Sequence, residues 1–159
     1  MEQEDGHVGE SNIVKRITDY IEDHLEDDLR LDKIAEELHY SKFYLARIFA
    51  GETGCTIYKY IQGRRLTLAA GKLVETEKAI IEIAYEARYG SQQAFTLAFE
   101  RLYLYTPQEY RKRGSFYPVQ PKLGIQNAQN ASLYAYRSYI GGLPAGCSRA
   151  VYGRGGAAA

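Results

Sequence analysis

Apolar residues recur at intervals of three and four between residues 11 and 113, the spacing that places them on one face of a helix. The pattern predicts a first helix with Ser11 as its N-cap, ending in the acidic stretch 26–28. Six more follow: 31–38, 41–53, 56–76, 79–87, one opening at Ser91, and one opening at Thr106 with a capping-box sequence. We therefore expect an all-α fold of about seven helices, with the long helix 56–76 as a connector.

Part of this pattern occurs twice, about 50 residues apart. The first copy contains Ile34, Ala35, Tyr40, Ser41, Leu45, Phe49, Gly54, Thr56 and Tyr60, and the second contains Ile83, Ala84, Tyr89, Ser91, Phe95, Phe99, Leu104, Thr106 and Tyr110. Each copy predicts a short helix, a tight turn and a longer helix that opens at a serine. That is the layout of a DNA-reading helix-turn-helix. Two copies at fixed spacing imply a composite surface on one face of a duplex.

The longer helix of each copy has an apolar face and an opposite face that we interpret as reading DNA bases. In the first copy the reading face holds Phe43, Ala46 and Arg47, and in the second it holds Gln92, Gln93, Thr96 and Leu97. Arginine pairs with guanine and glutamine with adenine in the major groove. Alternatively, Arg47 is a solvated surface side chain, and the glutamines contact phosphate or their own helix terminus.

The predicted connector helix has a length suited to DNA. Twenty helical residues span about 30 Å, and successive major-groove faces of B-DNA lie about 34 Å apart. We therefore expect a first subdomain over 11–55, a linker helix over 56–76 and a second subdomain over 77–113. A rigid linker of this length places two reading helices in adjacent major-groove segments.

Charge is graded along the chain although the formal net charge is zero. Residues 1–40 carry 13 acidic and 4 basic side chains, residues 41–114 carry 7 and 12, and residues 115–159 carry none and 4. Positive charge thus begins where the first reading helix begins, which suits a polyanionic partner. Simple solvation of helix faces is the alternative explanation.

Several residues suit contacts with DNA phosphate. They are Ser41, Lys42, Arg64, Ser91, Arg111 and Lys112. Helix N-termini bind anions through their backbone amides, which favours the two serines. Plain N-capping explains both serines equally well, and favourable charge at a helix C-terminus explains the basic run 111–113. We expect Arg64 to be exposed.

Other classes of protein are not favoured. No apolar run is long enough to cross a membrane and the acidic N-terminus is no signal peptide, so we expect a cytoplasmic protein, associated with the nucleoid when bound. Cys55, Cys147 and the three histidines form no metal-binding spacing, and we expect no metal or cofactor. No nucleophile–base pair or phosphate-binding glycine loop appears, so we expect no enzyme. We expect residues 1–10 to be disordered and 114–159 to form a mostly irregular, Gly/Ala-rich tail.

With these residues in view, the chain resembles the AraC/XylS family of bacterial transcription regulators over about residues 11–113, and within it the MarA/SoxS/Rob branch. The resemblance is carried by Ile83-Ala84, the run Arg88–Thr96, Phe99, Thr106-Pro107 and Tyr110-Arg111. It implies two helix-turn-helix subdomains, binding of asymmetric promoter sites as a monomer, and recruitment of RNA polymerase. It also implies a structural role for Arg65, paired with an acidic group of a neighbouring helix.

The chain departs from this branch at three positions. Leu97 stands where arginine is usual, Ala46 replaces a longer polar side chain, and Leu104 replaces a glycine. We therefore expect the second unit to bind more weakly than the first, and the turn at Leu104 to adopt a conformation open to leucine or to shift.

Two alternative functions stay open. From Ser115 onward the chain resembles the link into the effector-binding domain of Rob-type members, which needs far more than 45 residues. The chain would then be an effector-responsive regulator with a truncated ligand domain, of which the aromatic segment 133–140 is a remnant. The other alternative is a helical adaptor that contacts RNA polymerase through the acidic face 19–37 without reading DNA.

Overall fold

The computed structural model describes residues 5–123, which form seven α-helices and no strand. The helices are α1 (Asp5–Asp23), α2 (Leu31–Leu38), α3 (Lys42–Thr53), α4 (Ile57–Glu75), α5 (Ile80–Glu86), α6 (Gln92–Tyr103) and α7 (Pro107–Arg113). The prediction of an all-α fold with about seven helices is confirmed. The segment 133–140, which the effector-responsive alternative makes a ligand-domain remnant, lies outside the described residues.

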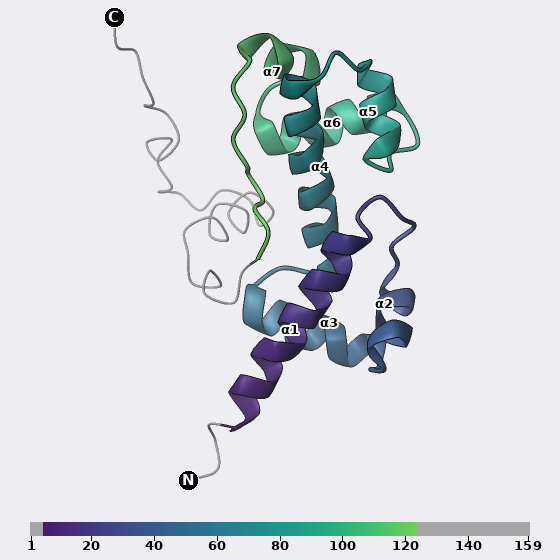
Figure 1. The fold of residues 1–159 in the computed structure, drawn as a ribbon, viewed down its shortest axis with the longest axis vertical. Helices are drawn as coiled ribbons and strands as arrows, with labels where there is room; N and C mark the ends of the chain where they lie inside the picture. The colour runs from purple at the N-terminus through teal and green to yellow at the C-terminus, as the bar shows by residue number, and fades with distance from the viewer. Residues whose placement is uncertain (1–4, 124–159) are drawn as a thin grey trace, which may run out of the picture.

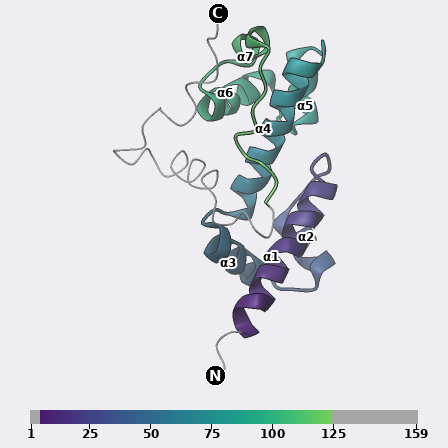
Figure 2. The ribbon, with the colours of Figure 1, turned by 60° about the vertical axis from the view of Figure 1, so that its left-hand side comes forward.

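The helices form two groups joined by one long helix. Helices α1, α2 and α3 make the first subdomain, in the lower half of Figure 1, and α5, α6 and α7 make the second, in the upper half. Helix α4 runs lengthwise between them, and the same division is visible after a 60° turn in Figure 2. Consequently α3 and α6, the longer helices of the two repeats, lie toward opposite ends of the linker helix.

The helix starts follow the capping residues in the sequence. The hydroxyl oxygens of Ser41, Thr56 and Ser91 accept hydrogen bonds from the backbone N–H groups three residues onward, at 3.2, 3.2 and 3.1 Å. At α7 the Thr106 hydroxyl accepts from the Glu109 N–H, and the Glu109 carboxylate accepts from the Thr106 N–H. These bonds satisfy N–H groups that a helix start leaves unpaired, and they confirm four of the five predicted N-caps.

The predicted boundaries of α1 are wrong at both ends. The helix begins at Asp5, six residues before Ser11, so Ser11 is not its N-cap and residues 5–10 are helical. It ends at Asp23, before the acidic stretch 26–28, and a series of tight turns follows. Arg65 supplies the reason, because its guanidinium donates to the carbonyls of Leu25 and Asp27 at 2.8 and 2.7 Å. The helix therefore ends where Arg65 of α4, in place of a further helical turn, donates hydrogen bonds to these carbonyls.

Buried aromatic and aliphatic side chains form a first core around α1–α3 and a second core around α5–α7, and α4 joins the two into one continuous cluster. Ile17, Ile21, Ile34, Leu45, Phe49 and Tyr60 are fully buried in the first, and Ile83, Phe95, Phe99, Tyr103 and Tyr110 are buried in the second. The ring of Phe99 stacks on Tyr103 at 4.6 Å between centroids and meets Tyr110 edge-on at 5.4 Å. These tyrosines are core residues, as expected. Leu68 of α4, by contrast, is 42% exposed and lines a hollow between the subdomains.

Residues 115–123, which we call the strap, return along α4 from the second subdomain to the first (Figure 1). The Tyr117 N–H donates to the Tyr110 hydroxyl, the Gln120 N–H donates to Thr67 of α4, and the Leu123 N–H donates to the Tyr60 hydroxyl. Lys122 forms an ion pair with Asp19 of α1 at 3.2 Å. The folded unit therefore extends past the boundary predicted at residue 113.

Within residues 5–123, three residues other than glycine have a left-handed backbone: His39, Arg88 and Leu104, with φ of 59°, 65° and 63°. Leu104 follows α6 just as Gly54, with φ of 73°, follows α3. The turn at Leu104 thus keeps the glycine-type geometry, and leucine adopts it despite the steric cost.

Candidate nucleic-acid interface

The reading face predicted on α3 is exposed. Phe43 is 78% exposed and Arg47 is also exposed, while Ala46 between them is half-buried. On the opposite side of the helix, Leu45 and Phe49 are fully buried in the first core. The helix is therefore anchored by one face and presents the other, the arrangement that a recognition helix requires.

An aromatic stack that was not predicted from the sequence supports Arg47. The guanidinium of Arg47 lies 5.6 Å from the centroid of the Tyr44 ring, and Tyr44 stacks on Tyr40 at 5.5 Å. Arg16 of α1 lies 5.8 Å from the Tyr40 ring. Cation–π contacts of this kind restrict a long arginine side chain before it meets a partner. The signal in the sequence is the i, i+3 spacing of Tyr44 and Arg47.

The reading face predicted on α6 is likewise exposed, but it carries no positive charge. Gln92 and Gln93 are exposed, Leu97 is 52% exposed, and Thr96 is half-buried. These four side chains line an open hollow together with Ile81, Tyr85, Ser91 and Glu100. Ile81 and Tyr85 come from α5 and were not predicted. The second face thus joins amide groups to exposed apolar surface, whereas the first offers an arginine and a phenylalanine.

The candidate phosphate residues at the two helix starts remain accessible. The hydroxyls of Ser41 and Ser91 accept backbone hydrogen bonds, which leaves each hydroxyl proton free to donate to an anion. Lys42 forms an ion pair with Asp32 at 3.0 Å, and both side chains are exposed. Exposed pairs contribute little stability, so Lys42 can exchange Asp32 for a phosphate.

The expectation of an exposed Arg64 is wrong. Arg64 is 8% exposed, and its guanidinium donates to both carboxylate oxygens of Glu22, at 2.7 and 2.9 Å. A third bond, of 2.7 Å, runs to the Gln120 carbonyl of the strap. Arg64 lies one helical turn from Tyr60, whose hydroxyl donates to the same carboxylate, so both face α1. Arg64 joins α1, α4 and the strap and is not a phosphate ligand.

Arg65 and Arg111 also have structural partners. Arg65 has the structural role that the resemblance implied, but its partners are backbone carbonyls after α1 and not an acidic side chain. Arg111 donates to the Leu73 carbonyl at 3.0 Å and to the Lys78 carbonyl, which fastens α7 to the end of α4. Within the basic run, Arg113 lies over the Tyr105 ring at 4.4 Å, and Lys112 is exposed. Of the run, Lys112 is therefore the candidate for phosphate contact.

The free thiol of Cys55 fits a packing role. Cys55 is buried, and burial raises the pKa of its thiol, with a smaller opposing effect from a hydrogen bond to Thr53. A buried thiol with a raised pKa is rarely a thiolate and reacts slowly. The geometry therefore supports a packing role for Cys55 and does not favour redox sensing.

Taken together, two capped helices with exposed reading faces, joined by one linker helix, define a DNA-binding protein with two helix-turn-helix units. The helix-turn-helix domain family matches residues 34–113. The chain belongs to that family, the AraC-type DNA-binding transcription regulators. It is a sequence-specific DNA-binding regulator.

Similar proteins cover the same region. Regulatory protein SoxS of Salmonella typhimurium is 39% identical over 106 residues, 67% of this chain and 99% of that protein. The right origin-binding protein of Escherichia coli is 37% identical over 120 residues, 74% of this chain but 42% of that protein. The chain thus spans less than half the length of that relative.

Solved structures show the same fold. The C-terminal domain of AraT, a response regulator from Geobacillus stearothermophilus, has a TM-score of 0.61 at 35% identity, covering 66% of this chain and 87% of that one. An AraC-type transcriptional regulator from Chromobacterium violaceum has a TM-score of 0.64 at 26% identity, covering 68% and 96%. Similar proteins are thus transcription regulators. None of the helices in residues 5–123 combines the length and apolarity needed to span a bilayer.

Proposed function

We propose that the chain binds promoter DNA as a monomer, with α3 and α6 in adjacent major-groove segments, and that it activates transcription in the cytoplasm by recruiting RNA polymerase. The observation that carries this proposal is the pair of exposed reading faces on one continuous linker. Helix α4 has 19 residues and spans about 28 Å, close to the repeat of about 34 Å between major-groove faces.

In this proposal the reading faces of α3 and α6 contribute differently to DNA binding. Arg47 reads guanine, flanked by Phe43 and Ala46, while Gln92 and Gln93 read adenine and Thr96 and Leu97 contact thymine methyl groups. Ser41, Lys42, Ser91 and Lys112 contact phosphate. The reading face of α6 carries amides and apolar groups and no cation. DNA binding by α6 therefore depends more on shape complementarity and less on charge than binding by α3.

The test compares Arg47→Ala with Lys112→Ala on a preferred duplex and on random DNA. Loss of a bidentate base contact costs about 1–3 kcal/mol, so Arg47→Ala should lower affinity for the preferred duplex by about 5- to 150-fold and change random-DNA binding far less. Lys112→Ala is the matched control, because loss of a phosphate contact weakens both duplexes alike and lowers the salt slope by about one. Equal losses on both duplexes for Arg47→Ala would contradict base reading.

A further inference from the structure

Arg88 occupies a costly backbone conformation at the centre of the second helix-turn-helix. It lies in the turn between α5 and α6 with φ of 65°, in the left-handed region that favours glycine. Its counterpart in the first repeat is His39, with φ of 59°, in the turn between α2 and α3. Such outliers persist where surrounding contacts hold them, and they point to a role for the residue.

The side chain of Arg88 crosses from the second subdomain to the first. Its Nε donates a hydrogen bond to the backbone carbonyl of Glu26, in the turns that follow α1. The adjacent carbonyls of Leu25 and Asp27 accept from Arg65 of α4. Two arginines thus bind three successive carbonyls. Within residues 5–123, the His39 side chain makes no comparable bond to the other subdomain. The turn at His39 therefore serves as a comparison for the turn at Arg88.

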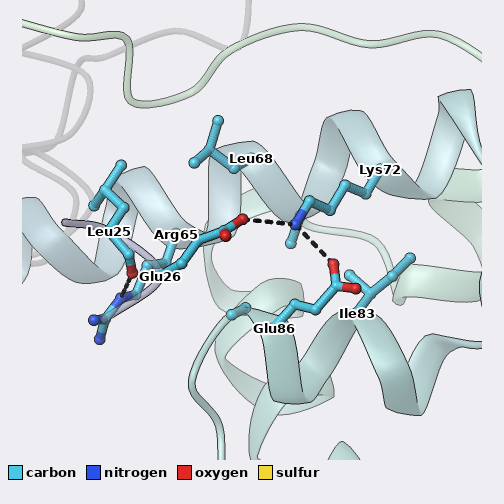
Figure 3. A pocket seen from close by; sticks show the side chains of 9 residues that line it. Leu25, Glu26, Arg65, Leu68, Lys72, Ile83 and Glu86 are labelled. Atoms are coloured by element: carbon cyan, nitrogen blue, oxygen red, sulfur yellow. Dashed lines mark hydrogen bonds and ion pairs between the residues drawn. The ribbon is translucent and has the colours of Figure 1, made fainter. Parts of the chain in front are cut away.

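Other contacts at this junction run through the linker helix. Lys72 of α4 bonds to Glu26 at 3.4 Å and to Glu86 of α5 at 2.7 Å, as the dashed lines in Figure 3 show. Buried Leu25 and Ile83 line the hollow beside them, from the first and second subdomains respectively. These contacts leave each subdomain attached to α4, whereas the Arg88 bond joins the two subdomains directly.

We propose that Arg88 is a positioning residue that sets the orientation of the second reading helix relative to the first. The turn that holds Arg88 leads directly into Ser91 and α6, so the bond to Glu26 fixes the start of that helix against the first subdomain. This orientation determines which spacing of two DNA blocks the protein accepts. The effect on DNA-block spacing rests on the proposed function, whereas the orientation of α6 relative to the first subdomain does not.

The first experiment measures orientation without DNA. Spin labels at exposed positions of α2 and α6, introduced as Glu37→Cys and Arg101→Cys with Cys55→Ala and Cys147→Ser, report the distance distribution between the subdomains. Loss of a hydrogen bond of ordinary strength should raise the population of displaced arrangements about two- to ten-fold in Arg88→Gly and in Arg88→Ala. His39→Gly relieves the same kind of backbone strain while keeping the Arg88 bond, and should leave the distribution as in the parent.

The second experiment uses duplexes whose two blocks are moved apart or together by one or two base pairs. The parent and His39→Gly should bind best at one spacing, while Arg88→Gly should accept neighbouring spacings with affinities about two- to ten-fold closer to the optimum. Unchanged distance distributions in both Arg88 variants would overturn the proposal even if DNA binding is intact. Altered distributions in a protein that selects no DNA sequence would support the positioning role and contradict the proposed function.

Discussion

At the scale of single residues, the two repeats place different residues in the same left-handed conformation. Gly54 and Leu104 both end a recognition helix with a left-handed backbone, although only glycine adopts that geometry without steric cost. At Leu104 the chain accepts this steric cost and keeps a φ close to that of Gly54.

Replacing Leu104 with glycine should stabilise the protein. The left-handed backbone costs an L-residue about 1–2 kcal/mol, and glycine loses about 0.5–1 kcal/mol in entropy, so we expect a net gain of about 0.5–1 kcal/mol. Leu104 is 71% exposed, so little packing is lost. Denaturant titration measures the change, with Gly54→Ala as the reverse control, expected to destabilise. A loss of stability in Leu104→Gly would show that its side chain makes a contact of greater value.

At the candidate site, helical spacing predicted the exposure of some side chains but not of others. Helical spacing was enough to separate the exposed Phe43 and Arg47 from the buried Leu45 and Phe49. It was not enough to place Arg64, which we expected to be exposed, and the structural role of Arg65 followed from the resemblance and not from spacing. Their assignment depends on Glu22 and the carbonyls after α1, about 40 positions away in the chain, and local spacing carries no information on such partners.

At the scale of elements, α1, α4 and the strap are joined by one buried polar group. The Glu22 carboxylate accepts from the Tyr60 hydroxyl at 2.9 Å and from two nitrogens of Arg64, and the two charged side chains are 12% and 10% exposed. Arg64 also binds the Gln120 carbonyl of the strap. No sequence motif predicts this strap, because an extended segment has no apolar periodicity of a helix and gains its hydrogen bonds from α4 and its neighbours.

Removing one partner of this buried pair should destabilise the fold strongly. Glu22→Leu leaves the Arg64 charge buried without its carboxylate, which costs about 3 kcal/mol. The double variant Glu22→Leu/Arg64→Met replaces the pair by apolar groups and should lose less than half as much, because no unpaired charge remains. Equilibrium unfolding in denaturant gives both values. A double variant as unstable as the sum of its two single variants would show that the carboxylate and guanidinium act independently.

At the scale of the whole molecule, both cores contain tyrosines whose ionisation is suppressed. Burial raises the pKa of Tyr60 and Tyr103, and it raises the pKa of Tyr89 to about 12. In the unfolded chain these hydroxyls titrate near their ordinary value of about 10. A raised folded-state pKa contributes stability that is fully present below that value and is lost as the pH rises toward the folded-state pKa.

The free energy of unfolding should therefore fall steadily above about pH 10. Ultraviolet absorbance of tyrosinate, followed together with circular dichroism, separates exposed from buried hydroxyls. The buried tyrosines should ionise together with loss of helix. Ionisation of all tyrosines before any loss of helix would contradict the packing described for the two cores.

The main proposal also concerns the whole molecule: two helix-turn-helix units on one linker helix read a composite DNA site. Its most direct test is selection of bound duplexes from a random library by the purified chain at near-physiological salt. We expect a recovered motif with two blocks about one helical turn apart. Absence of enrichment, with binding that disappears steeply as salt rises, would mean attraction to phosphate alone and would contradict the account.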